Sequence, residues 1–371
     1  MTKLLNHINT YQSEADYKND KSKDFPNVSY IVENDNVLFV KEKTDYSNDY
    51  LTFEAIEDGT FTFTGTNSNS LSYSLDDGET WTALASGTAS PTVTAGNKIM
   101  WKGTCTPSDT GSGIFSATAN FNVQGNIMSL LFGDDFTNQT NLTGKDYAFY
   151  ELFKQNTNIK SAKNLILPAT TLASNCYNGM FRGCTSLVTA PTLPAITLAS
   201  NCYGSMFWGC ESLETAPTLP ATELASSCYY GMFLGCTSLT TAPELPATTL
   251  ANNCYQFMFY ACTNLVNAPV LPATTLADSC YLGMFQDCRN LVTAPVLPAT
   301  KLADSCYYQM FYRCTNLNYI KCLATNISAS NCLSNWVNGV ASSGTFVKNA
   351  SMTSWTTGTS GIPNGWDVVT E

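Results

Sequence analysis

Residues 167–192 of the chain read LPATTLASNCYNGMFRGCTSLVTAPT. Six such units of 26 residues follow one another without a gap and fill positions 167–322. They begin at Leu167, Leu193, Leu219, Leu245, Leu271 and Leu297. A fixed period of roughly 20–50 residues is typical of repeat proteins, in which each unit buries its apolar face against the units before and after it.

The central part of each unit predicts a short helix. Cys176, Met180 and Cys184 are spaced four residues apart, which places them on one face of a helix. Ser174 or Asn175 is a suitable N-terminal cap. The position of Ser174 holds an aspartate in two later units, Asp278 and Asp304.

The rest of each unit predicts a helix exit, a strand and two rigid corners. Gly183 suits a left-handed exit, residues 187–190 are expected to be extended, and Pro191 ends that strand. Pro168 and Pro191 begin two proline columns that keep the corners rigid. Because one short helix and one short strand cannot enclose a core, the units are expected to stack, with ladders of Leu, Cys, Met and Phe inside.

Two cysteine columns are predicted to be buried, reduced, apolar side chains. In a helix Cys176 and Cys184 would lie roughly 12 Å apart, at about 1.5 Å per residue, and a disulfide allows only about 7 Å. Equivalent cysteines on neighbouring helical turns, roughly 8–10 Å apart, are also too distant. No Cys-x-x-Cys pair occurs and His7 is the only histidine, so we expect no metal site and no cofactor.

One family resemblance rests on residues 181–187. Phe181-Arg182-Gly183-Cys184-Thr185-Ser186-Leu187 resembles the Ala-Phe-x-x-Cys-x-x-Leu core of BspA-type leucine-rich repeats, with Met in place of Ala and an added cysteine column at Cys176. The resemblance covers about 145–335. It implies a leucine-rich-repeat solenoid, in a family of extracellular adhesins from anaerobic bacteria that carry export signals.

The first 45 residues are predicted to be an anchoring arm with a β-hairpin: residues 28–32 and 37–40 are apolar and flank a four-residue turn. Both strands are too continuously apolar to have a wet face. We expect the hairpin to pack either on the next domain of its own chain or on another protein or another copy. The candidate anchoring residues are Phe25, Tyr30, Ile31, Val32, Leu38 and Phe39.

With the remaining segments included, the sequence predicts that the chain belongs to the α+β fold class and is mostly β. Residues 46–125 predict a small β-sandwich with an immunoglobulin-like layout. The expected strands include residues 60–64, 70–74, 98–101 and 115–121. Residues 126–166 are predicted to be the N-terminal cap of the solenoid, with a spacing of 28 to the first true unit, and 323–371 a degenerate repeat and C-terminal cap.

Residues 74–81 match the Asp-box signature SxDxGxTW, which is known from sialidases. A glycosidase is the tempting interpretation. However, the box is a hairpin device in which Asp76 holds the turn, Gly78 takes a positive φ and Trp81 packs beneath. Sialidases resemble one another in carrying several copies with an arginine cluster and a tyrosine nucleophile, so a single copy predicts a structural turn.

Composition and residue types argue against several function classes. Charged residues are 13% of the 371 residues and the net charge is −11, which disfavours nucleic acid as a partner. No stretch approaches the roughly 20 apolar residues of a membrane span, and no apolar run of signal-peptide length begins the chain. We therefore expect no membrane insertion and folding in a cytoplasm.

Catalysis is not expected, and no residue is predicted to be catalytic. A single histidine in the arm leaves no Ser/His/Asp or Cys/His centre for the core, and no phosphate or dinucleotide motif occurs. Carboxylates for a glycosidase pair exist, but they occupy non-equivalent positions of their units, which indicates surface charge. They are Glu211, Glu214, Asp278 and Asp287.

Columns that vary among the six units are expected to point outward. Two of them are rich in aromatic residues, which on a rigid, weakly charged surface suit sugar rings or another protein. The alternative is that they cover the convex face or contact neighbouring subunits. The candidate ligand-binding residues are Arg182, Trp208, Tyr230, Tyr260, Tyr308 and Tyr312.

A second resemblance concerns the ends. Residues 25–35 look like the N-termini of virion proteins from tailed phages of gut Bacteroidales, including crAss-like phages, and residues 361–368 look like the closing cap of their repeat proteins. It implies a protein of the virion surface that is assembled in the host cytoplasm: a head fibre, a capsid decoration protein or a tail-associated adhesin, with the head fibre favoured. By the same resemblance its arm docks on a capsid or other virion protein, it is trimeric by analogy, and it adheres to a host surface glycan or protein. The alternative is a bacterial cell-surface adhesin.

Overall fold

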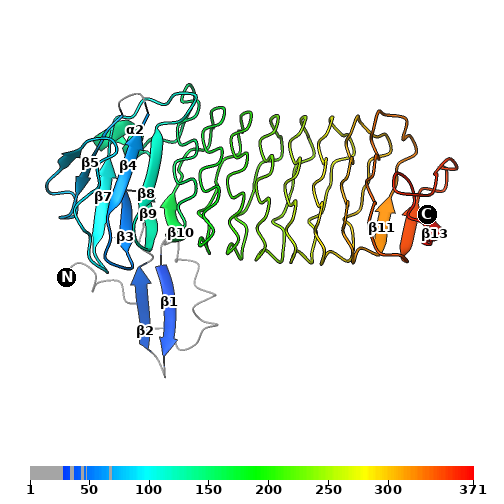
Figure 1. Cartoon of the computed structure of the whole chain (residues 1–371), viewed down its shortest axis with the longest axis horizontal. Helices are drawn as coiled ribbons and strands as arrows, with labels where there is room; N and C mark the ends of the chain where they lie inside the picture. Colours follow the sequence, from blue (N-terminus) through cyan, green and yellow to red (C-terminus); the bar gives the residue numbers. More distant parts are fainter. Residues whose placement is uncertain (1–27, 34–36, 43–45, 47, 67–68) are drawn as a thin grey trace. The chain divides into compact units, whose positions relative to one another are not determined.

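The computed structural model describes residues 28–33, 37–42, 46, 48–66 and 69–371, the first two ranges by their backbone. The chain divides into two units, residues 1–48 and 49–371. In the first, β1 (Val28–Glu33) and β2 (Val37–Glu42) pair antiparallel, with Ile31 opposite Phe39 (Figure 1). The predicted strand pairing is confirmed. Among the candidate anchoring residues, Phe25 and the side chains of the other five lie outside the described residues.

The second unit begins with two β-sheets. Their strands are β3 (Leu51–Ala55), β4 (Phe61–Gly65), β5 (Leu71–Ser74), β6 (Thr82–Leu84), β7 (Lys98–Lys102), β8 (Gly113–Ala117), β9 (Phe121–Asn126) and β10 (Ile159–Ile166). The larger sheet has the order β10-β9-β3-β7-β5-β6, and the smaller sheet pairs β4 with β8. The two sheets contact each other through aromatic rings: Phe53 of β3 lies 5.3 Å from Phe61 and 4.9 Å from Phe115 between centroids.

The single strand predicted over residues 115–121 is wrong. β8 ends at Ala117 in the smaller sheet, and β9 begins at Phe121 in the larger one. Between them the Thr118 N–H donates to the Thr60 carbonyl, and the Asn120 carbonyl accepts the Ile56 N–H. The chain crosses from one sheet to the other at this point, a tertiary event that alternation along one segment does not reveal.

The helix predicted over residues 176–184 is also wrong. The segment is a series of tight turns in which the N–H groups of Met180 and Cys184 donate three residues back, to Tyr177 and Phe181. The alternate N–H groups donate to the next unit instead: that of Tyr177 reaches Cys202 at 3.0 Å. A helix directs every N–H along its own axis, so it could not form these bonds between units. We call residues 175–184, with their equivalents in the other units, the turn ribbon, and each 26-residue unit a coil.

Every fourth residue of the turn ribbon has a left-handed backbone, with φ of +55° at Asn175, +63° at Gly179 and +75° at Gly183. The left-handed conformation predicted for Gly183 is confirmed, but Asn175 caps no helix. A four-residue period also keeps Cys176, Met180 and Cys184 on the inside, as predicted, because each turn returns the chain to the same side. It buries the following residues as well, Tyr177 and Phe181 in the first coil.

The coils stack in register, so equivalent side chains form ladders. Phe181 and Phe207 lie 5.7 Å apart with an interplanar angle of 4°, and Tyr203 and Tyr229 lie 6.0 Å apart at 0°. All fifteen cysteines are buried and free. The predicted burial of the Leu, Cys, Met and Phe columns is therefore confirmed, and Figure 1 shows the coils side by side.

The stack begins on the larger sheet. β10 pairs parallel with β9, and register shifts between Ile159 and Ser161 and between Ser161 and Asn164 interrupt this pairing. Beyond β10, single parallel bridges link Ser161 to Thr189 and Thr189 to Thr215. The bridge from Ser161 to Thr189 spans 28 positions, the spacing expected from the sequence.

The stack ends on a parallel sheet of β11 (Tyr319–Cys322), β12 (Thr345–Lys348) and β13 (Asp367–Thr370). Trp336 continues the tyrosine ladder at 6.3 Å from Tyr307, and its indole N–H donates to the Gly361 carbonyl at 2.8 Å. Within the described residues the helices are α2 (Ser129–Phe132) and the 3-10 turn η2 (Gly133–Asp135). The chain is therefore mostly β.

Candidate functional site

The outward side of the turn ribbon carries the two variable columns. The first column is Arg182, Trp208, Leu234, Tyr260, Gln286 and Tyr312, and the second is Asn178, Gly204, Tyr230, Gln256, Leu282 and Tyr308. All of these residues are half-buried except Gly204, which is buried. The two columns lie four positions apart in a ribbon with a four-residue period, so they share one side of it. The predicted surface is therefore outside the core, but its aromatic rings are partly covered by their neighbours.

The first candidates interact across adjacent coils. The guanidinium carbon of Arg182 lies 4.0 Å from the centroid of the Trp208 ring, a cation–π contact. Its Nη1 lies 3.8 Å from Glu151 Oε1, and the same carboxylate accepts Lys154 Nζ at 2.7 Å. Burial first, and then the charge of Glu151, raises the pKa of Tyr150. These groups partner one another, which leaves little unpaired charge for a ligand.

The next candidates meet through a residue that sequence reasoning missed. Tyr230 and Tyr260 both contact Phe257, at centroid distances of 6.1 Å and 6.0 Å. Phe257 belongs to the left-handed column of the ribbon, where other coils carry Gly179, Ser205, Gly231, Gly283 and Gln309. The signal in the sequence is an aromatic residue in a column that otherwise holds glycine or a polar residue. The structure joins Tyr230 to Tyr260 through this ring.

The last candidates lie one turn apart in the sixth coil. Tyr308 and Tyr312 are both half-buried. The guanidinium carbon of Arg313 lies 5.9 Å from the centroid of the Tyr312 ring. The six candidates therefore fall into three groups along the stack, and the middle group has the most aromatic contacts.

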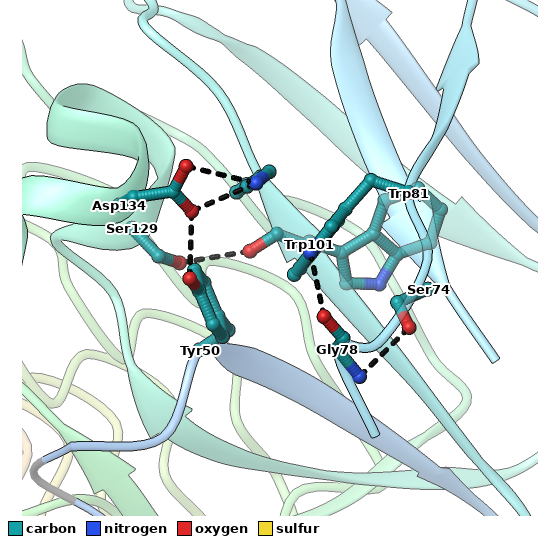
Figure 2. A network of polar contacts seen from close by, with 8 residues as sticks. Tyr50, Ser74, Gly78, Trp81, Trp101, Ser129 and Asp134 are labelled. Carbon is teal, nitrogen blue, oxygen red and sulfur yellow. Dashed lines mark hydrogen bonds and ion pairs between the residues drawn. The ribbon is translucent and has the colours of Figure 1, made fainter. Parts of the chain in front are cut away.

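The Asp box forms a hydrogen-bonded turn between β5 and β6, and Figure 2 shows its residues Ser74, Gly78 and Trp81. The carboxylate of Asp76 accepts the Ser74 hydroxyl at 2.7 Å and the Thr80 N–H at 2.9 Å. Hydrogen bonds from Thr80, first from its side chain, lower the pKa of Asp76 to about 2. Gly78 has a φ of +90° and accepts the Trp81 indole N–H at 3.0 Å. The predicted turn roles of Asp76 and Gly78 are confirmed.

The ammonium group of Lys102 connects this hairpin to η2. Lys102 Nζ lies 4.3 Å from the centroid of the Trp81 ring and 2.7 Å from Asp134 Oδ1. The Tyr50 hydroxyl donates to the same oxygen at 2.6 Å, and burial, followed by this hydrogen bond, raises the pKa of Tyr50 to about 12 (Figure 2). Trp81 meets the Tyr50 ring at 4.7 Å. The polar groups of Tyr50, Trp81, Lys102 and Asp134 each have a partner within the protein, so this arrangement stabilises the turn.

The acidic residues are dispersed. Glu211, Glu214 and Asp278 are exposed, while Asp287 is buried and pairs with Arg289 at 3.1 Å. Within the described ranges no group of three or more His, Cys, Asp or Glu side chains could hold a metal ion. The cysteine thiols are poor nucleophiles because burial raises the pKa of each, to about 12 at Cys184.

In comparison with known proteins, no family model, no curated protein and no solved structure matches the chain. In the part of the chain that the structure describes, no helix has the length and apolar character needed to cross a bilayer.

Proposed function

We propose that this chain is a phage virion structural protein, a head fibre or capsid decoration protein that displays a repeat domain for adhesion to the host surface. The observation that carries the proposal is the ribbon face, where half-buried aromatic side chains stand on a backbone that is hydrogen-bonded from coil to coil. A rigid aromatic surface binds with little loss of conformational entropy.

In this proposal the repeats are a leucine-rich-repeat solenoid of the BspA type. Residues 46–125 are its immunoglobulin-like partner, and the segments at 126–166 and 323–371 are its caps. What supports the caps is the continuation of the ladders beyond the six units: Phe153 stacks 5.3 Å from Phe181 at one end, and Trp336 stacks on Tyr307 at the other. Terminal repeats of such proteins are atypical because one face meets solvent.

The arm is the proposed anchor on a capsid or other virion protein. Support comes from the separation of residues 1–48 as their own unit and from the pairing of β1 with β2. A lone two-stranded hairpin is marginal in water, so a partner surface would stabilise it. Assembly takes place in the host cytoplasm, and the assembled fibre is a trimer by analogy.

A bacterial cell-surface adhesin is the second candidate, favoured by the BspA-like motif at Phe181–Leu187. It shares the adhesive repeat face with the first candidate and differs in what holds the protein in place. The first candidate requires residues 1–45 for attachment to the particle, whereas the second does not require them for display on the cell surface.

Proteomics of purified virions tests the proposal, and deletion of residues 1–45 tests whether the arm is the segment that attaches the protein to the particle. We expect the full chain to copurify with particles and the deleted chain to be absent from them while remaining folded by circular dichroism. A Thr249→Glu variant, which copies Glu223 of another coil, should be incorporated normally. If the chain is missing from virions, or if the deleted chain is still displayed on a bacterial surface, the virion assignment fails.

A further inference from the structure

Phe257 occupies a backbone conformation that its side chain disfavours. Its φ is +56°, in the left-handed region where a Cβ collides with the backbone and where bulky residues are rare. The equivalent residues two coils before and two coils after are Ser205 and Gln309, and the adjacent coils carry Gly231 and Gly283. An aromatic ring at a strained position is a reason to look for a role outside folding.

The ring of Phe257 is held from two sides. It occupies the space that a Cβ on Gly283 would need, so it rests on the backbone of the following coil. Tyr230 of the preceding coil meets it at 81°, edge to face, and Tyr260 meets it at 54°. The three half-buried rings therefore come from two coils and are seated on a third, which fixes their relative positions before any ligand arrives.

The surroundings of the three rings carry amides and aliphatic groups. The neighbouring members of the two variable columns are Leu234, Gln256, Leu282 and Gln286. The side-chain oxygen of Gln286 lies 3.4 Å from the place of a Cβ on Gly283, so its amide lies at this patch. The next formal charge along the ribbon is that of Asp287, which pairs with Arg289 at 3.1 Å. No formal charge in this group of residues is left to select a charged ligand.

We propose that Tyr230, Phe257 and Tyr260 form the binding site for a neutral sugar ring of a surface glycan. The apolar C–H face of a pyranose stacks on an aromatic ring, and its hydroxyls find partners in the tyrosine hydroxyls and in the amides of Gln256 and Gln286. An anionic glycan would lack a cation here, since Arg182 is engaged by Trp208 and Glu151. This inference rests on the adhesive function proposed above and names its site.

The test measures retention of the purified full-length chain on immobilised neutral polysaccharides (mannan, dextran and galactan) and on charged ones (heparin and polygalacturonate). Two variants replace a ring by the residue found at the equivalent position of the preceding coil. Phe257→Gly copies Gly231, and Tyr260→Leu copies Leu234. We expect the parent to bind at least one neutral polysaccharide, and each variant to lose binding by tenfold or more. Thr249→Glu is the control: Thr249 is exposed, lies outside the turn ribbon and forms a parallel bridge with Glu223 of the preceding coil, so this variant should bind as the parent does.

Unfolding is separated from loss of the site by the melting temperature. Phe257→Gly relieves the left-handed strain, so its melting temperature should equal or exceed that of the parent while its binding is lost. Retention by charged polysaccharides alone, no retention of the parent by any of the three neutral ones, or unchanged binding by Phe257→Gly would each overturn the sugar site. Virion incorporation is measured in a separate experiment. Failure of the sugar site therefore does not contradict the virion assignment, and failure of the virion assignment does not contradict the sugar site.

Discussion

The ring of Phe257 lies where Gly283, the equivalent residue of the next coil, would place a Cβ. The same column alternates along the stack: the left-handed residues are Glu151, Gly179, Ser205, Gly231, Phe257, Gly283 and Gln309. Side chains from this column lie over the glycine that follows; the Cγ of Glu151 is 3.1 Å from the site of a Cβ on Gly179. In adjacent coils the side chain of one coil therefore fills the space above the glycine of the next. A consensus sequence of a single coil does not show this pairing.

Gly283→Ala should destabilise the protein more than Gly231→Ala. Both positions have a left-handed backbone, φ +58° and +54°, which costs alanine about 1–2 kcal/mol. A Cβ at Gly231 would meet nothing closer than 3.7 Å, whereas one at Gly283 collides with Phe257, adding about 1–3 kcal/mol of overpacking. Urea unfolding measures both. In the double variant Phe257→Gly/Gly283→Ala the extra loss should disappear, and its persistence would contradict the contact.

Tyr203→Phe should leave the stability unchanged or raise it by about 1 kcal/mol, because burying a hydroxyl without a hydrogen bond is unfavourable. Among the described residues no partner accepts or donates to the hydroxyls of Tyr177, Tyr203 and Tyr229. Tyr50→Phe is the opposite control: it removes the 2.6 Å bond to Asp134 and should cost about 1 kcal/mol. A loss at Tyr203→Phe similar to that at Tyr50→Phe would mean that the buried hydroxyl is bonded in solution, for example to a water.

Ellman's reagent at pH 8 should leave the native thiols almost unlabelled. The thiolate is the reacting species, and burial raises the pKa of Cys184, Cys202 and Cys262 to about 12. Unfolding in guanidinium should release all fifteen thiols. Cys332, which has the largest exposed fraction among them at 4%, should react first, as located by mass spectrometry. Rapid native labelling of the ladder cysteines would mean that the stack opens.

The Asp76→Asn variant should lose stability at neutral pH, and this difference should vanish in acid. The pKa of Asp76 is lowered to about 2 in the folded chain and is about 3.9 when unfolded. A depressed pKa stabilises the fold above the unfolded value, and this contribution is lost as pH falls from about 4 to 2. Melting temperatures of parent and variant at pH 6, 4 and 2 measure the gap. A gap that stays constant over this range would contradict the assigned role.

The helix error has an identifiable physical origin. Cys176, Met180 and Cys184 share one side whether the chain turns every 3.6 residues or every four, so the spacing alone does not separate the two backbones. Gly179 and Gly183 carried the missing information, because two glycines within five residues disfavour a helix and suit left-handed positions. The site shows the same limit: the variable columns were visible along the chain, whereas the contact of Phe257 with Tyr230 joins different coils.

The amino-acid sequence by itself determined the 26-residue period, the burial of the Leu, Cys, Met and Phe columns and the pairing of β1 with β2. Burial follows from side-chain chemistry repeated at a fixed spacing, and such repetition is legible without coordinates. Only the tertiary structure decided the backbone of the turn ribbon and the grouping of its aromatic rings. The reason is that the N–H of Tyr177 finds its acceptor at Cys202, in the next coil, so the conformation of each coil depends on a neighbour that local sequence does not contain.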